Sequence, residues 1–120
     1  MIGFILNLVS SILTWLFKPM IYSYCSIIAL YRREWNEYNM NLAIGKDQYG
    51  NALSKYLFNQ ILITKDGYKF GNVDETISSV IGKNKVKGTL LIFGKGLDFI
   101  LNLLEPNHSI NSIDETEDDK

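Results

Sequence analysis

The sequence has few of the residues that build disulfides and metal sites: its 120 residues include one cysteine, Cys25, and one histidine, His108. A single cysteine cannot form a disulfide within the chain, and one residue of each kind does not make a zinc site. Negative charge is missing from residues 1–33, where Lys18, Arg32 and Arg33 carry the only side-chain charges. We therefore expect neither a metal nor another cofactor, and we expect an apolar medium around the N-terminus.

Charge elsewhere in the chain indicates no particular partner. Lys83, Lys85 and Lys87 form a basic cluster that is too small, and too free of interleaved aromatic residues, for a nucleic-acid surface. We therefore expect no nucleic-acid partner. Residues 114–120 are acidic and contain no apolar side chain, which predicts a disordered tail.

A long apolar run occupies residues 2–31. A bilayer core needs about 20 helical residues, so this run is too long for one untilted span. Pro19, preceded by Lys18, divides the run, and because proline removes a backbone donor we expect a kink or a break there. The chain opens without a positive charge, which fits an uncleaved anchor better than a secretory signal.

The first half of this run has a polar face. Its small and polar residues recur at spacings of three and four: Gly3, Asn7, Ser10, Ser11, Thr14 and Lys18. Three arrangements fit this pattern: a tilted span with Lys18 reaching the interface, a helix lying in the membrane plane, and a helix that packs on copies of itself through Gly3, Asn7, Ser11 and Thr14. The alternative without a membrane is a buried helix of a soluble protein.

Orientation follows from the residues that end the run. Arginine and lysine are enriched on the cytoplasmic side of membrane segments, so Arg32 and Arg33 predict a cytoplasmic body. Trp35 follows directly and, with nearby tyrosines, fits the aromatic belt of a membrane interface.

The body, residues 34–113, contains signs of helices and of one short β-hairpin. Asp47 follows Gly45 and is placed to cap a helix whose apolar residues repeat at three and four. Asp66-Gly67 stands between the β-prone runs 61–64 and 68–70, which predicts a hairpin.

Two further helices are expected in the body. Asn72 or Asp74 caps a short helix that Gly82 ends, and a last helix over residues 90–104 stops at Glu105-Pro106. The fold class is therefore mainly α: a kinked N-terminal membrane helix (1–33), a small α-rich body (34–113) with one hairpin, and the acidic tail (114–120).

Three segments of the body have a distinctive composition: residues 71–83, with the string Asp-Glu-Thr-Ile-Ser-Ser, Leu97-Asp98, and residues 106–113, which begin Pro-Asn-His-Ser. Together with Asp47-Gln48 and Asn51, they resemble a group of small proteins encoded by bacteriophages and prophages, over residues 47–113. The resemblance implies a small accessory phage protein associated with lysis or with the host envelope. With the apolar run 2–31 as an anchor, the location of such a protein would be the bacterial inner membrane or a virion membrane.

Candidate catalytic residues exist, although no motif organises them. Ser78 or Ser79 with His108 and Asp98 has the composition of a nucleophilic triad, and Glu75 with Asp98 that of an acid/base pair. No Gly-x-Ser-x-Gly elbow surrounds either serine. The plainer interpretation is a hydrogen-bonded network that holds the short helix against the C-terminal segment, with the members Asp74, Glu75, Thr76, Ser78, Lys83 and His108.

Three functions are compatible with these features. The first is a phage membrane protein that acts by assembly or contact, and the second is a membrane-tethered hydrolase of the cell envelope. The third is a virion structural protein that inserts its apolar helix into a partner.

Overall fold

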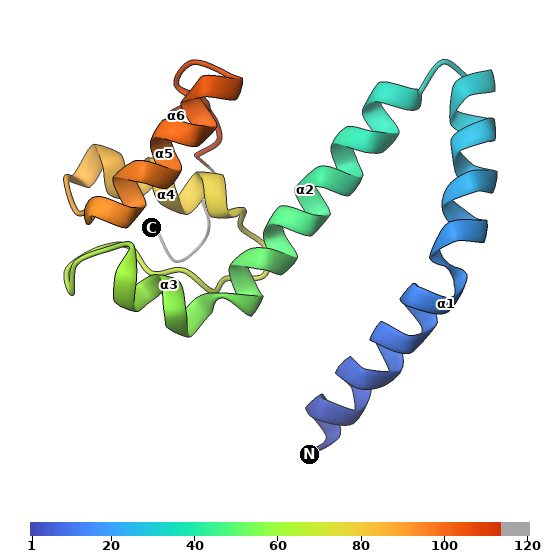
Figure 1. Cartoon of the computed structure of the whole chain (residues 1–120), viewed down its shortest axis with the longest axis horizontal. Helices are drawn as coiled ribbons and strands as arrows, with labels where there is room; N and C mark the ends of the chain where they lie inside the picture. Colours follow the sequence, from blue (N-terminus) through green and yellow to red (C-terminus); the bar gives the residue numbers. More distant parts are fainter. Residues whose placement is uncertain (114–120) are drawn as a thin grey trace. The chain divides into compact units, whose positions relative to one another are not determined.

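The computed structural model describes residues 1–113 as helices joined by loops, the longest of which covers residues 62–76 (Figure 1). The helices are α1 (Ile2–Tyr31), α2 (Trp35–Leu53), α3 (Lys55–Ile61), α4 (Ile77–Lys87), α5 (Ile92–Leu104) and α6 (His108–Asn111). The predicted mainly helical chain with a long apolar N-terminal helix is confirmed. The chain divides into two compact units, Met1–Asn41 and Leu42–Lys120. The predicted acidic tail lies outside the described residues.

Helix α1 runs through Pro19 without a break, although its ribbon changes direction about midway (Figure 1). A proline inside a helix removes one backbone hydrogen bond and bends the axis. Two hydroxyl groups in α1 bond back to carbonyls of the same helix: Ser11 donates to Asn7 (2.9 Å) and Ser23 to Pro19 (2.7 Å). The hydrogen-bonding needs of these two side chains are therefore met within the helix.

A tight turn and a group of aromatic side chains join α1 to the start of α2. Arg33 adopts a positive φ of 61°, which reverses the chain between the two helices. The ring of Tyr22 lies 6.2 Å from that of Trp35 and 6.1 Å from that of Tyr38. Its hydroxyl donates to the Asn39 side chain at 2.9 Å. We call these four side chains, Tyr22, Trp35, Tyr38 and Asn39, the clasp.

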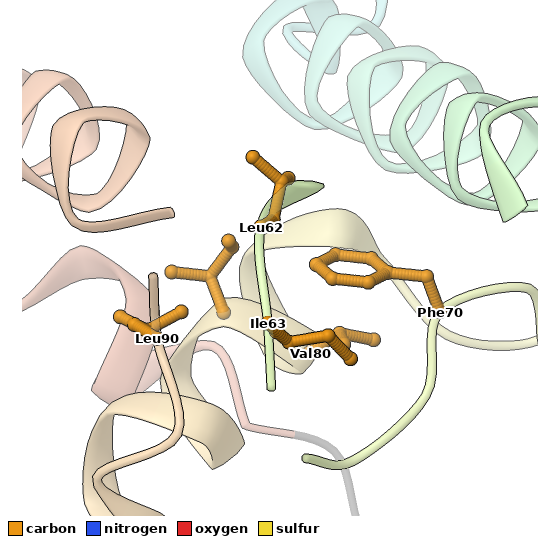
Figure 2. Packing of buried hydrophobic residues seen from close by; sticks show 6 residues of the cluster. Leu62, Ile63, Phe70, Val80 and Leu90 are labelled. Carbon is orange, nitrogen blue, oxygen red and sulfur yellow. The ribbon is translucent and has the colours of Figure 1, made fainter. Parts of the chain in front are cut away.

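The hydrophobic core of the second unit is small. Its buried members are Leu62, Ile63, Phe70, Val80, Ile81 and Leu90. Figure 2 shows how the labelled side chains converge from the end of α3, the following loop, α4 and the segment before α5. Phe58 extends the cluster by packing edge-on against Phe70, with ring centroids 5.4 Å apart.

The predicted hairpin is wrong, because residues 1–113 contain no strand and a single isolated bridge. Asp66-Gly67 does lie in a turn, but the segment 61–64 pairs with residues 89–91 instead, through a bridge between Ile63 and Leu90. On either side of this bridge, the N–H of residue 64 donates to the carbonyl of residue 89, and the N–H of residue 91 donates to the carbonyl of residue 62. The segment 68–70 has side-chain amides as partners instead of a strand. Pairing with residues close to α5 therefore replaces pairing across the turn.

Helix α4 begins and ends later than the sequence predicts. Its N-cap is Thr76, whose hydroxyl accepts the Ser79 N–H (3.1 Å), rather than Asn72 or Asp74. The helix then passes through Gly82 and ends at Gly88, which has a φ of 75°. A Cβ at Gly82 would collide with the backbone carbonyl of Ser109, so this glycine allows α6 to approach α4 closely.

Candidate functional site: the polar network around α4

Three asparagines bond the backbone of the loop that leads to α4. Asn59 accepts the N–H of Phe70 (2.7 Å) and donates to its carbonyl (3.1 Å). Asn84 does the same for Tyr68, at 2.9 Å in both directions. Amide side chains offer one acceptor and two donors, so each can replace a peptide group of a neighbouring strand.

Asn51 completes this arrangement at the next turn of the loop. Its amide accepts the N–H of Gly71 (2.9 Å) and donates to the carbonyls of Asn72 (3.1 Å) and Glu75 (2.8 Å). Asn51 and Asn84 are fully buried. Buried backbone groups without partners are costly, so these amides fix the path of the loop that carries Glu75.

Glu75 is the centre of the network and is itself fully buried. Its carboxylate accepts from the Tyr68 hydroxyl (2.8 Å) and the Ser79 hydroxyl (2.6 Å), and pairs with the Lys83 ammonium (2.6 Å). That ammonium also lies 4.3 Å from the centroid of the Tyr68 ring. The Glu75 carboxylate therefore has a cation and two hydroxyl donors as partners, all within its own unit.

Asp47 caps a helix, but not the one the sequence predicts. It lies inside α2, and its carboxylate accepts the backbone N–H of Ile77 (2.9 Å) and the hydroxyl of Ser78 (3.2 Å). A carboxylate at a helix N-terminus satisfies an unpaired N–H and is favoured by the helix dipole. Asp47 therefore attaches the end of α2 to the start of α4.

A second charged cluster joins α4, α5 and α6. The carboxylate of Asp98 accepts from the Ser109 hydroxyl and from the Asn102 amide (3.4 Å), and pairs with Lys85 (2.9 Å). Asp98 is 7% exposed and Ser109 is fully buried. The contact therefore ties the C-terminal segment to the polar face of α5.

The structure does not assemble the candidate triad. His108 pairs with Glu105 at 3.2 Å, Ser78 bonds to Asp47, and Asp98 bonds to Ser109 rather than to His108. The two carboxylates of the candidate acid/base pair are held in separate clusters, Glu75 with Lys83 and Asp98 with Lys85. In residues 1–113 there is also no group of three or more His, Cys, Asp or Glu that fits a metal ion.

The predicted network exists in part and with different members. Glu75 and Lys83 form its ion pair, Thr76 caps α4, and Ser78 bonds to Asp47. Asp74 is exposed, and it is Ser109 rather than His108 that anchors the C-terminal segment.

Sequence reasoning missed several residues that organise the network: Asn59, Asn84, Lys85 and Ser109. Asparagine is a poor helix former, so Asn59 in α3 and Asn84 in α4 needed a tertiary reason to be there. That mismatch was the available signal.

The residues predicted to set the membrane anchor lie along α1 and its turn. Lys18 is exposed, Arg32 and Arg33 form the turn, and Trp35 begins α2. On the polar face of α1, Gly3, Asn7 and Thr14 are exposed and Ser11 is half-buried.

Comparison with known proteins adds no relative. No family model, no curated protein and no solved structure matches the chain.

Proposed function

We propose that this chain is a small phage membrane protein, anchored by α1, that acts by assembly or contact at the membrane rather than by catalysis. The observation that carries the proposal is the exposure of α1. This helix of 30 residues is long and apolar enough to cross a membrane, and none of its most apolar window is buried in the molecule. A helix that is apolar on most sides and not covered by its own chain needs lipid or a partner around it.

The clasp suggests which part of α1 lies in lipid. The Tyr22–Asn39 bond sets the polar first half of α2 beside the last third of α1, and that half contains Glu37 and several asparagines. Such side chains are costly in a bilayer. The spanning part is therefore residues 2–21, about 20 residues, which matches a hydrocarbon core of ~30 Å.

The position of Lys18 supports this depth. Lys18 then lies about one turn from the end of the span, where its ammonium reaches the headgroups.

The body fits a contact role because its polar residues serve its own fold. Glu75 and Asp98 are held by lysines and hydroxyls of the same unit. The resemblance of residues 47–113 to small phage proteins supports the phage origin within this proposal. Its location would be the host inner membrane or a virion membrane, with the body on the cytoplasmic side of an inner membrane.

Self-association is the proposed form of assembly. Gly3, Asn7, Ser11 and Thr14 share one face of α1, and small or hydroxylated residues allow membrane helices to approach closely. Asn7→Cys in a Cys25→Ser background should form an oxidised dimer in membranes, whereas Val9→Cys, outside this face, should not.

The membrane proposal is tested by expressing the full chain in bacteria and extracting the membranes with alkaline carbonate. We expect the protein to stay with the membranes, with an intact mass that includes residues 2–31. Release into the aqueous fraction contradicts membrane anchoring, and loss of those residues identifies a cleaved signal sequence instead.

Orientation is tested by a reporter fused after Lys120. A cytoplasmic body predicts fluorescence of a green fluorescent protein fusion and an inactive alkaline phosphatase fusion. The double variant Arg32→Gln, Arg33→Gln should lose this preference, because it removes the positive charge that orients the span. An active phosphatase fusion on the unaltered chain contradicts the orientation and favours a hydrolase of the cell envelope.

A further inference from the structure

Helix α5 packs against the body with its small and polar residues. Gly94 and Asp98 are its buried residues. A Cβ at Gly94 would collide with the carbonyl of Leu62, and Asp98 is held by Lys85 and Ser109. The inner face is therefore fixed by close backbone contact at Gly94, by the paired charge of Asp98 and by the half-buried Leu97, which packs against the core. Most of the apolar residues of α5 take no part in it.

The apolar stripe of α5 points outward. Its exposed members are Ile92 (84%), Phe93 (71%), Phe99 (63%), Ile100 (56%), Leu103 (69%) and Leu104 (83%). At about 100° per residue they fall within an arc of roughly 140° on the helix surface. A helix on the surface of a soluble protein normally turns such an arc toward the core, so the orientation of α5 is inverted.

The size of this face calls for a partner. Six large apolar side chains that are more than half exposed leave on the order of 800 Å² uncovered, above the usual range for the largest patch of a soluble monomer. We define these six residues as the α5 face.

We propose that the α5 face is a second membrane contact, in which α5 lies in the plane of the bilayer interface. This inference rests on the proposed function, because α1 holds the body beside a membrane and raises the effective concentration of lipid around it. Its 13 residues are too few to span, since they reach only ~20 Å.

Charge around the arc favours lipid as the occupant. The helix has two charged residues: Lys95, which is exposed beside the arc, and Asp98, which is turned inward and paired. A lysine at the edge of an apolar arc can lie along the acyl boundary and reach an anionic headgroup. Asp98, which would be costly in lipid, is shielded by the body.

A second copy of this chain is the less suitable occupant. A stable interface buries about 800 Å² on each partner, so a second copy would have to cover almost the whole α5 face. A bilayer has no such threshold, since the apolar area buried in it adds to an anchor that already exists.

The test uses the full chain with Cys25→Ser and one new cysteine, labelled with the environment-sensitive fluorophore NBD. The protein is reconstituted in vesicles of phosphatidylethanolamine and phosphatidylglycerol that contain lipids with nitroxide on the acyl chain. The labelled positions are Leu103→Cys on the α5 face, Leu13→Cys in α1, and Val86→Cys in α4. Val86 is a matched control, because it is an apolar residue of the same unit with 70% exposure, against 69% for Leu103.

We expect quenching by the nitroxide lipids at Leu13 and Leu103 that is severalfold stronger than at Val86. Quenching at Leu103 no stronger than at Val86, with Leu13 quenched, overturns the second contact and leaves the anchor in place. An unquenched Leu13 overturns the anchor itself. A label at Leu103 that is shielded from aqueous iodide only at high protein-to-lipid ratio, without nitroxide quenching, assigns the face to a second copy and also overturns the inference.

Discussion

The two units of the chain use side chains in opposite ways. In the first unit the apolar residues of α1 are exposed, and its one buried residue is Ala29. In the second unit, over the described residues, six buried hydrophobic residues stand beside seven buried polar ones, among them Glu75 and Asp98. Exposed apolar side chains need an apolar medium or a partner around them, whereas buried polar groups need hydrogen-bond or charge partners within the fold.

Helix α5 shows that this contrast does not follow the boundary between the units. Like α1 it exposes apolar side chains, and like the body it buries a paired carboxylate. The comparison teaches that the position of each helix is set by the needs of its polar groups, and that its apolar groups then indicate the medium outside.

The largest effect is expected from Glu75→Ala, which leaves Lys83 without its carboxylate in a site where the lysine side chain is 11% exposed. Loss of one partner of a buried ion pair costs about 3–5 kcal/mol. Thermal unfolding of the full chain in detergent micelles measures the loss.

Two variants sharpen this result. The exposed Asp74→Ala should change stability by less than about 0.5 kcal/mol. Adding Lys83→Met to Glu75→Ala should recover part of the loss, because it removes a charge that has lost the Glu75 carboxylate. Equal unfolding temperatures for Glu75→Ala and Asp74→Ala would show that the network does not hold the body together.

A matched pair of charge insertions probes the medium of each unit. Val9→Asp places a carboxylate within residues 2–21 and should oppose membrane insertion by about 2.5–3.5 kcal/mol. Val73→Asp changes an exposed valine of the body and should have almost no effect on insertion or folding. The membrane-bound fraction after alkaline extraction checks both, and a Val9→Asp chain as firmly bound as the parent argues against lipid around α1.

A pair of glycine substitutions probes packing within the body. Gly82→Ala should destabilise it by about 1–3 kcal/mol, because the new Cβ meets the backbone of Ser109. Gly96→Ala should be neutral or stabilise by up to about 1 kcal/mol, since nothing lies within 4 Å of its Cβ and alanine favours helix. Thermal unfolding distinguishes them; the reverse order would mean that α6 does not pack on α4 as described.

The smallest effect is expected at the clasp. Tyr22→Phe removes the hydrogen bond to Asn39, which is worth about 0.5–1.5 kcal/mol. Opening of the clasp should raise the rate at which a maleimide labels the half-buried Cys25. Tyr24→Phe, at an exposed position, serves as the control. Identical labelling rates in the two variants would show that the Tyr22 hydroxyl does not hold the clasp closed.

Local sequence predicted the features that depend on composition and spacing. The length of the apolar run and the arginines at its end delimit α1, and the stripe and Glu105-Pro106 delimit α5. The direction of the α5 stripe was not predictable, because it depends on bonds from Asp98 to Lys85 and to Ser109, each more than ten positions away.

Two errors have the same physical origin. A glycine that ends a helix and a glycine that admits a neighbouring backbone look the same in a sequence, so the sequence wrongly predicts that Gly82 ends α4. Asp66-Gly67 permits a hairpin but does not require one, and asparagines from α2, α3 and α4 took the bonds that a second strand would have made. Both outcomes depend on tertiary neighbours.

The asparagine pairing of residues 68–72 has a consequence for solubility. An extended segment with free peptide groups is a template on which a second molecule adds a strand, and such addition begins aggregation. Here the amides of Asn51, Asn59 and Asn84 already occupy the N–H or carbonyl groups of Tyr68, Phe70, Gly71 and Asn72. The loop is thereby protected against intermolecular β-addition at these groups.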